Sequence, residues 1–287
     1  MKRKYLFFAA LILAVLACIG APSVIHAQEP LILGFPSFLS ATELHKRFGP
    51  LAEHLGRELG RPVKILNEGD YEAHMYRIKK GKVDIAFLGP AAYIAYTKKF
   101  GKVPLLAVYE TDGKKTFRGF IVVNKASTIT KLSQLRGKNF AFGDAKSTMG
   151  HILPRYIMMR SGIEVKHLGR HEFLGNHENI ALGVLSGKFD AGAVREDIYN
   201  TYSKEGLNVL AISEPMPDHL FVARPGLQYK TVSKVTKILV SLKDTEDGRK
   251  ILRSMQKNLT ALIAGSDKDY DSLREIIDYL AKAGVKL

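Results

Sequence analysis

Two hydroxyl side chains, Ser147 and Thr148, stand between an apolar stretch at 139–142 and an expected helix at 148–160. The first N–H groups of a helix lack partners within the helix and carry a partial positive charge. Hydroxyls beside such groups can bind a carboxylate, a phosphate or a similar oxyanion. Serine and threonine are also common helix N-caps, so capping without a ligand is the other interpretation.

A histidine occupies a comparable position in the segment 174–179, which also leads from a strand into a helix. There His177 can donate a ring N–H to an anion, although a lone histidine is often a structural hydrogen-bonding residue. The helix has no His-x-x-x-His pair and no glutamate-rich face. We therefore expect no metal site.

A tyrosine is the first residue of another expected helix, at 71–80. It directly follows Asp70, and aspartate is one of the residues preferred at the N-cap. From this place Tyr71 can point its phenol to the edge of the sheet, and packing explains it equally well. Tyr93 follows the turn Gly89-Pro90, with proline at the first helical position, and is expected in the core.

The first 27 residues have the pattern of a secretory signal peptide. Positive residues 2–4 precede an apolar run at 5–19, which is shorter than the roughly 20 residues of a membrane-spanning helix. We expect cleavage after Ala27 and a soluble, periplasmic chain that is not an integral membrane protein. Lipid attachment at Cys18 is the alternative.

Several classes of chemistry are absent from the sequence. Cys18 is the only cysteine, so the exported chain has no thiol for a disulfide, a nucleophile or a metal. There is no Gly-x-Ser-x-Gly elbow and no cluster of carboxylates and histidines, so we expect neither an enzyme nor a cofactor.

The 287 residues are 46% apolar and 25% charged, which is typical of a globular protein. The 43 lysines and arginines exceed the 28 acidic residues, and this excess favours solubility or an anionic partner. The positive residues are spread along the chain, and export separates it from nucleic acid, so no nucleic-acid partner is expected.

Strands and helices are expected to alternate along the mature chain, which indicates an α/β fold. Right-handed crossovers place the carboxyl ends of the first strands along one rim, where open α/β sheets bind ligands. The first series comprises strands at 31–35, 63–66, 83–88 and 105–109 and helices at 43–59, 71–80 and 91–99. The second comprises strands at 120–123, 139–142 and 190–194 and helices at 148–160 and 178–186. The last part has a strand at 220–223 and helices at 232–242, 247–258 and 268–283.

The predicted organisation is therefore two lobes with a ligand cleft between them. After the signal peptide at 1–27, residues 28–116 begin the first lobe and 117–213 form the second. Residues 214–287 return to the first lobe and supply the C-terminal helices. Pro154 weakens the first turn of the helix expected at 148–160, so that helix is predicted to begin later.

The mature chain resembles the periplasmic phosphate/phosphite/phosphonate-binding proteins of ABC importers, which have the type 2 periplasmic-binding fold. The resemblance covers nearly the whole mature chain, and the order and spacing of its motifs together make it specific. The motifs are Phe48-Gly49-Pro50-Leu51-Ala52, Asp70-Tyr71, Val83-Asp84-Ile85-Ala86-Phe87-Leu88-Gly89-Pro90, Ser147-Thr148-Met149-Gly150, Gly175-Asn176-His177-Glu178 and Asp190-Ala191-Gly192-Ala193-Val194.

The resemblance implies which residues bind the ligand. The family's Ser-Thr-Ser-Gly turn, whose hydroxyls and amides hold the phosphonate oxygens, corresponds to Ser147, Thr148 and Met149. Met149 lacks the side-chain donor but keeps its backbone N–H. The family's binding histidine corresponds to His177, and its first-lobe tyrosine corresponds to Tyr71.

Two further positions depart from the family's pattern or extend it. A Tyr-x-Ser pattern on the strand that crosses between lobes aligns with Phe117-Arg118-Gly119, where both polar side chains are lost. Arg118 is a candidate for a charge-assisted contact in their place, or is simply solvated. Asp218 lies near the position where aminophosphonate binders keep a carboxylate for the ligand amine.

The predicted function is that of a non-catalytic, monomeric solute-binding protein. A small phosphorus oxyanion (phosphonate, phosphite or phosphate) is held between two lobes that close on it, and the closed form docks on the transmembrane subunits of an ABC permease. The alternative is a sensor of the same fold that signals to a membrane kinase or chemoreceptor. The sequence does not separate these two roles.

Overall fold

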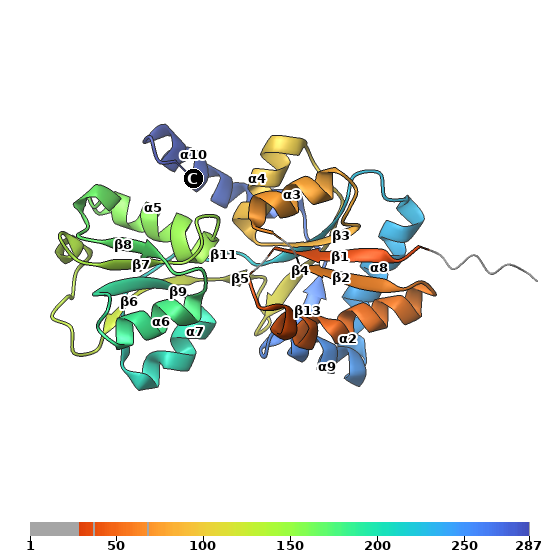
Figure 1. The fold of residues 1–287 in the computed structure, drawn as a ribbon, viewed down its shortest axis with the longest axis horizontal. Coiled ribbons are helices and arrows are strands. Elements are labelled where there is room, and N and C mark those ends of the chain that lie inside the picture. The colour runs from red at the N-terminus through yellow and green to blue at the C-terminus, as the bar shows by residue number, and fades with distance from the viewer. Residues whose placement is uncertain (1–28, 37, 68, 287) are drawn as a thin grey trace, which may run out of the picture.

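The computed structural model describes residues 29–36, 38–67 and 69–286, and it has two α/β lobes side by side (Figure 1). Each lobe is built on one mixed sheet with helices on both of its faces. The predicted α/β class and the two lobes are confirmed. The predicted signal peptide and Cys18 lie outside the described residues.

The sheet of the first lobe has the strand order β13-β4-β12-β3-β1-β2. β1 pairs in parallel with both β2 and β3, which places the carboxyl ends of these three strands at one edge as predicted. β12 runs antiparallel between β3 and β4. The strands are β1 (Leu31–Phe35), β2 (Val63–Asn67), β3 (Ile85–Leu88), β4 (Leu105–Thr111), β12 (Leu220–Ala223) and β13 (Leu259–Ile263). The helices are α2 (Ala41–Leu59), α3 (Tyr71–Lys79), α4 (Pro90–Phe100), α8 (Tyr229–Ser241), α9 (Glu246–Met255) and α10 (Asp271–Lys282).

The sheet of the second lobe has the order β10-β6-β9-β7-β8. Gly192 on β9 is packed tightly, since a Cβ there would lie 2.4 Å from Ile180 of the covering helix α6. The strands are β6 (Gly119–Asn124), β7 (Phe140–Phe142), β8 (His171–Phe173), β9 (Ala191–Arg195) and β10 (Leu207–Ile212). The helices are α5 (Leu153–Arg160), α6 (His177–Leu185) and α7 (Glu196–Tyr202).

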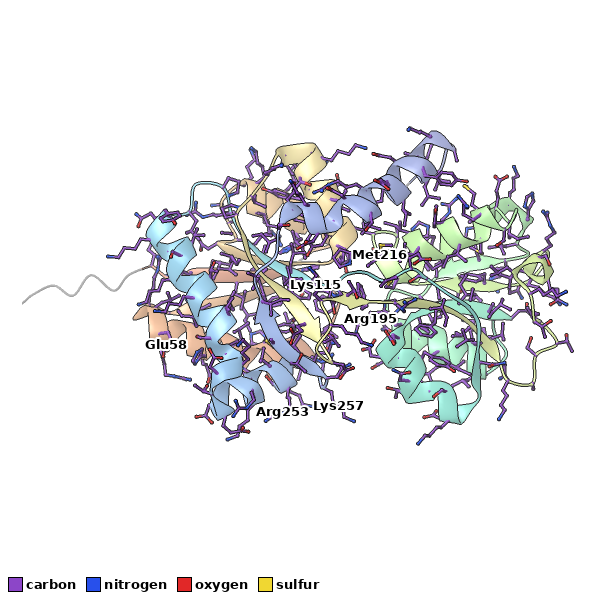
Figure 2. All side chains as sticks on the ribbon, turned by 180° about the vertical axis from the view of Figure 1, so that it is seen from behind. Glu58, Lys115, Arg195, Met216, Arg253 and Lys257 are labelled. Atoms are coloured by element: carbon purple, nitrogen blue, oxygen red, sulfur yellow. The ribbon has the colours of Figure 1, made fainter. Side chains whose placement is uncertain are left out.

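The chain crosses between the lobes at β5 (Thr116–Phe117) and β11 (Met216–Pro217), which pair as a small antiparallel sheet. Figure 2 shows Lys115 and Met216 at this crossing, with Arg195 nearby where the two lobes meet. The predicted lobe boundaries at 116/117 and 213/214 fall at or near these strands, and where each lobe ends remains a prediction.

The C-terminal helix α10 also connects the lobes, because it contacts α4 in the first and α5 in the second. Tyr279 of α10 meets Tyr156 of α5 edge to face, with ring centroids 5.4 Å apart. Within the described residues, no helix combines the length and the apolar character needed to span a membrane.

The helix expected at 148–160 begins as a π-helical turn over Thr148–Ile152 and becomes α-helical only at Leu153, with Pro154 within its first two positions, so the predicted later start is confirmed. Two other predicted boundaries were wrong. The helix expected at 247–258 ends at Met255 and is followed by strand β13, which was not predicted. The first residues expected in the last helix form a separate 3-10 turn at Asp267–Tyr270.

Candidate functional site

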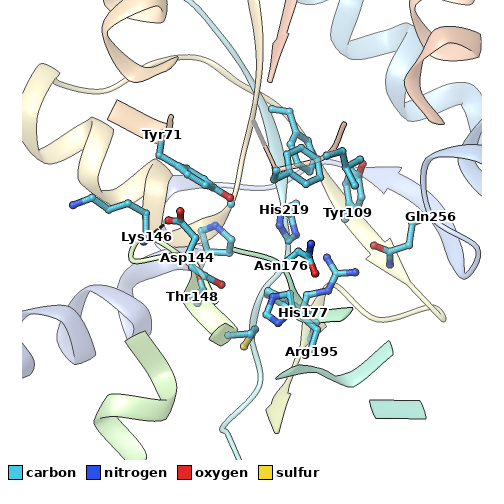
Figure 3. A pocket seen from close by; sticks show the side chains of 18 of the residues that line it. Tyr71, Tyr109, Asp144, Lys146, Thr148, Asn176, His177, Arg195, His219 and Gln256 are labelled. Atoms are coloured by element: carbon cyan, nitrogen blue, oxygen red, sulfur yellow. Dashed lines mark hydrogen bonds between the residues drawn. The ribbon is translucent and has the colours of Figure 1, made fainter. Parts of the chain in front are cut away.

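A cavity of about 110 Å³ lies between the lobes (Figure 3). The carboxyl-end rim of the first sheet supplies one wall, and the turns after β7, β8 and β9 supply the other. From the first lobe it is lined by Phe38, Tyr71, Phe87, Tyr109 and His219, and from the second by Ser147, Thr148, Met149, Asn176, His177 and Arg195. The structure thus brings together five of the seven residues predicted from the sequence.

The two predicted hydroxyls lie on the same wall, and each accepts one backbone hydrogen bond. Ser147 Oγ accepts from Gly150 N at 3.0 Å and caps the helix. Thr148 Oγ1 accepts from Ala91 N at 3.1 Å, and Ala91 belongs to α4 of the opposite lobe. A hydroxyl that accepts in this way keeps its own proton for donation. Both residues therefore act as caps and still have an O–H to offer in the cavity.

Met149 also lines the cavity, but its side chain is buried in the core that the lobes share. A Cβ at Gly119 would lie 3.1 Å from Met149 Sδ, so Gly119 leaves the room that the thioether occupies. The two departures from the family's pattern are therefore linked in space: the loss of a side chain at Gly119 accommodates the larger side chain at Met149.

His177 is the first residue of α6, and the side chain of Asn176 caps this helix by accepting from Asn179 N at 2.8 Å. Burial lowers the pKa of His177 to about 3, and the nearby Arg195 contributes to the same shift. The ring is therefore neutral at physiological pH. A hydrogen bond to the backbone of Ala193 acts against this shift of the pKa. Nδ1 is shielded from solvent and has no hydrogen-bond partner, so it is available to a ligand. Because the other ring nitrogen donates to Ala193, Nδ1 of the neutral ring is an acceptor, which suits the P–O–H group of a protonated oxyanion.

Tyr71 is the first residue of α3, where Asp70 caps the helix by accepting from Ala73 N at 2.9 Å. Burial raises the pKa of Tyr71, and the carboxylate of Asp144 adds to the shift. The phenol therefore stays protonated and can donate a hydrogen bond.

Asp218, in contrast, does not line this cavity. Its side chain is buried, with Oδ2 accepting from Thr111 Oγ1 at 3.0 Å and Oδ1 accepting from the backbone N of His219 at 2.7 Å. Oδ1 also lies 2.8 Å from His219 Nδ1. Because a carboxylate only accepts, Nδ1 carries the proton, and the other nitrogen of the ring is left for the cavity. Asp218 thus positions His219.

The His219 ring is also fixed by packing. It stacks on Phe87 with ring centroids 5.1 Å apart and planes at 5°. Asp218 was a predicted site residue, whereas its neighbour His219 was not predicted, because it carries no local motif of its own.

Arg195 lines the cavity, as do Arg47 and Lys146, whereas Arg118 does not. Arg118 Nη1 donates to the carbonyl of Ser213 at 2.9 Å, on the other crossing segment. The expected role for Arg118 therefore needs correction, because its guanidinium joins the two crossing segments. Arg195 ends β9, and its register partner is Gly119, the residue next to Arg118.

Asp197 holds Arg195 in a two-pronged ion pair, with Nε–Oδ1 at 2.9 Å and Nη2–Oδ2 at 2.5 Å. Burial disfavours the charge on Arg195, but Asp197 outweighs burial and raises the pKa of the guanidinium. Burial likewise acts against the charge on Asp197, yet Arg195 lowers its pKa to about 2. Both groups are charged at neutral pH.

Within the part of the chain that the structure describes, no group of three or more histidine, cysteine or acidic residues could hold a metal ion. The cavity instead gathers neutral hydrogen-bonding groups, and three cationic side chains, Arg47, Lys146 and Arg195, also line it. Two α/β lobes with such a cavity between them define the class of periplasmic solute-binding proteins.

Within that class, the family of ABC transporter, phosphonate, periplasmic substrate-binding proteins matches residues 33–270. The chain belongs to this family. Its members are substrate-binding components of transporters, so the protein is not an enzyme.

Two curated relatives show the extent of the similarity. A probable ABC transporter phosphite-binding protein of Prochlorococcus marinus is 26% identical over 251 residues, which cover 81% of this chain and 84% of the relative. The phosphonates-binding periplasmic protein of Escherichia coli is 25% identical over 275 residues, covering 91% of this chain and 80% of the relative.

The fold is also that of solved structures. The Prochlorococcus marinus protein in complex with methylphosphonate superposes with a TM-score of 0.79, at 24% identity, over 88% of this chain and 99% of that one. A binding protein of an ABC phosphonate transporter from Pseudomonas aeruginosa gives a TM-score of 0.77 at 21% identity, covering 88% of this chain and 86% of that one.

Proposed function

We propose that this chain binds a phosphonate, phosphite or phosphate in the cavity between its lobes, through Tyr71, Ser147, Thr148, His177 and the backbone N–H of Met149. The observation that carries the proposal is the convergence of neutral hydrogen-bonding groups from both lobes on one small cavity, with His177 Nδ1 shielded from solvent and unpartnered. The phosphite-binding and phosphonates-binding relatives support this ligand class.

Neutral donors suit a protein that must release what it binds. Each hydrogen bond to an anion is charge-assisted and strong in a cavity shielded from water. A cavity of about 110 Å³ is small against the roughly 300–1,000 Å³ of pockets for drug-sized molecules, so the ligand has few atoms. Because donors come from both lobes, a bound oxyanion favours the closed arrangement.

The decisive experiment removes both hydroxyls together. Ser147→Ala with Thr148→Ala should weaken binding of the phosphorus oxyanion by at least about a hundredfold, since two charge-assisted hydrogen bonds are lost. Isothermal titration calorimetry measures this loss. Ser233→Ala, at an exposed position on α8, is the matched control and should bind as the unaltered protein does. Unchanged affinity of the double variant for every oxyanion would refute the assignment.

The finer steps of transport belong to the same proposal. The ligand-bound monomer docks on the transmembrane subunits of the permease, and residues 1–27 direct export and are removed after Ala27. N-terminal sequencing of the exported protein should therefore begin at Gln28.

Cells that lack the chain should fail to take up isotope-labelled ligand at low external concentration. Normal uptake in such cells would contradict the transport role.

A further inference from the structure

Asp197 orients the guanidinium of Arg195 but accepts hydrogen bonds from only two of its three nitrogen atoms. The ion pair employs Nε and Nη2, and no hydrogen bond to another described residue employs Nη1. In Figure 3 the guanidinium reaches into the space between Asn176 and Gln256, away from Tyr71 and Thr148. The cavity therefore has, on the side away from Tyr71, a charged donor with an unused N–H, in addition to Arg47 and Lys146 elsewhere in its lining.

A second unused donor lies beside this cation. Tyr109 is 2% exposed and lines the cavity, and its hydroxyl has no hydrogen-bond partner. The hydroxyl is close enough to Arg195 for the two groups to interact electrostatically. A buried polar group without a partner costs free energy, and a ligand that accepts a hydrogen bond there relieves the cost.

The charges at this side of the cavity select against an amine. Both carboxylates near Arg195 are already engaged, because Asp197 is paired with Arg195 itself and Asp218 accepts from Thr111 and His219. The remaining carboxylate of the lining, Asp144, lies near Tyr71 on the other side of the cavity (Figure 3). An ammonium group on the side of Arg195 would therefore face the guanidinium without an available carboxylate. A carboxylate on the ligand would instead meet two donors that lack acceptors.

We propose that Arg195 and Tyr109 form a second subsite, which binds a carboxylate on the tail of the ligand. This inference rests on the proposed function, in which the other donors hold the phosphoryl group. The preferred ligand class is then a short carboxylated phosphonate, with one or two carbons between phosphorus and carboxylate so that both groups fit the small cavity. The charge-assisted hydrogen bond from Nη1 to the carboxylate raises the affinity. The ion pair with Asp197 fixes the orientation of the guanidinium and so the position that the carboxylate must take.

Calorimetric titration of the exported protein with three ligands tests the subsite. Phosphonoacetate should bind at least about tenfold more tightly than methylphosphonate, because it adds a charge-assisted contact, and 2-aminoethylphosphonate should bind most weakly. Equal or tighter binding of methylphosphonate would overturn the inference.

Two variants then test whether Arg195 and Tyr109 cause the preference for phosphonoacetate over methylphosphonate. Arg195→Gln should reduce the phosphonoacetate-to-methylphosphonate preference by at least about tenfold, and it should improve the relative binding of 2-aminoethylphosphonate, because Asp197 is left uncompensated. Tyr109→Phe keeps the shape of the ring and should reduce the same preference by about threefold or more. Arg249→Gln, an exposed position on α9, removes the same charge outside the cavity and should preserve the preference.

The outcomes also separate this inference from the proposed function. If methylphosphonate binds but neither variant changes the preference, the subsite is wrong and the oxyanion site stands. If no phosphorus compound binds the unaltered protein, both are wrong. Should Arg195→Gln fail to fold, Tyr109→Phe decides the matter alone, since an isosteric loss of one hydroxyl keeps the packing.

Discussion

Thr148 Oγ1 accepts a hydrogen bond from the backbone N–H of Ala91 at 3.1 Å, and this bond joins the second lobe to the N-terminus of α4 in the first. The contact lies at the wall of the cavity between the lobes. Thr148 therefore satisfies an N–H that α4 leaves unpaired, and its own hydroxyl proton stays available at the cavity wall. Under the proposed function, this residue couples closure of the lobes to ligand binding.

Thr148→Val should weaken oxyanion binding by about tenfold or more, because the closed form then contains a buried N–H without a partner, which costs about 1–3 kcal/mol. Thr148→Ser keeps the hydroxyl and should remain within about threefold of the unaltered protein. Calorimetry gives the affinities, and small-angle scattering with and without ligand reports closure. Equal affinities of the valine and serine variants would show that the bond between lobes does not contribute.

Gly150→Ala should abolish tight binding while leaving the protein folded. A Cβ at this position would lie 2.9 Å from Ser147 Oγ, 3.0 Å from Gly143 Cα and 3.1 Å from His177 Cε1, so the methyl group displaces the side chains of Ser147 and His177. Gly49→Ala is the matched control, because a Cβ at Gly49, inside α2, meets nothing within 4 Å. That control should raise the free energy of unfolding by about 0.5–1 kcal/mol and bind normally. Normal binding by the Gly150→Ala variant would contradict the placement of the turn.

Stability should fall as the pH drops from about 6.5 towards 4, because two buried histidines, His74 and His151, and the half-buried His177 are held in neutral form. Burial lowers the pKa of His74 and of His151 to about 4, and that of His177 to about 3. The unfolded chain takes up these protons near its ordinary pKa of about 6.5 whereas the folded chain does not, so acid favours unfolding. Each histidine contributes a slope of up to about 1.4 kcal/mol per pH unit within this window.

Urea unfolding of the ligand-free protein at several pH values measures that slope. His74→Gln, in the core of the first lobe, should reduce it by about 1 kcal/mol per pH unit, because glutamine does not titrate. A slope that is the same in the variant and the unaltered protein would show that His74 is not buried in neutral form.

Asp218→Asn should destabilise the protein by about 1–3 kcal/mol, because three donors from Thr111 and His219 converge on a group that then carries one acceptor oxygen and an NH2. Binding should weaken equally for methylphosphonate and 2-aminoethylphosphonate, since His219 loses its orientation. Asp247→Asn, on the surface of α9, controls for the change in charge. A loss confined to the aminophosphonate would instead place Asp218 in contact with the ligand amine.

The sequence predicts most of the fold because the apolar spacing in its first hundred residues is regular. Leu44, Phe48, Leu51 and Leu55 recur at helical spacing on α2, and all four are buried. The helix α7 was missed for the corresponding reason, since none of its residues is buried and it has no apolar stripe. Strand β13 was missed because its pairing with β4 is a contact between segments about 150 residues apart, which local periodicity does not contain.

The residues of the candidate site likewise fall into those that the local sequence pattern predicts and those that it misses. Ser147, Thr148 and His177 stand at strand-to-helix turns, so their positions alone indicate an anion site. Arg195 and Tyr109 carry no such signal, because each lies at or near the end of an ordinary strand and enters the cavity only when the lobes come together. The error over Arg118 has the same origin, since only the tertiary structure shows which arginine faces the cavity.

The central claim, that the cavity binds a phosphorus oxyanion, is tested most directly by thermal unfolding of the exported protein, first unfolded and refolded to remove any carried ligand. Phosphate, phosphite, methylphosphonate and phosphonoacetate are compared with sulfate and acetate. At about 100 times its dissociation constant, a ligand should stabilise the protein by about 2.7 kcal/mol. We expect this stabilisation with at least one phosphorus compound and none with sulfate. If no phosphorus compound stabilises the protein, or if sulfate does so equally, the cavity is not a phosphorus-oxyanion site.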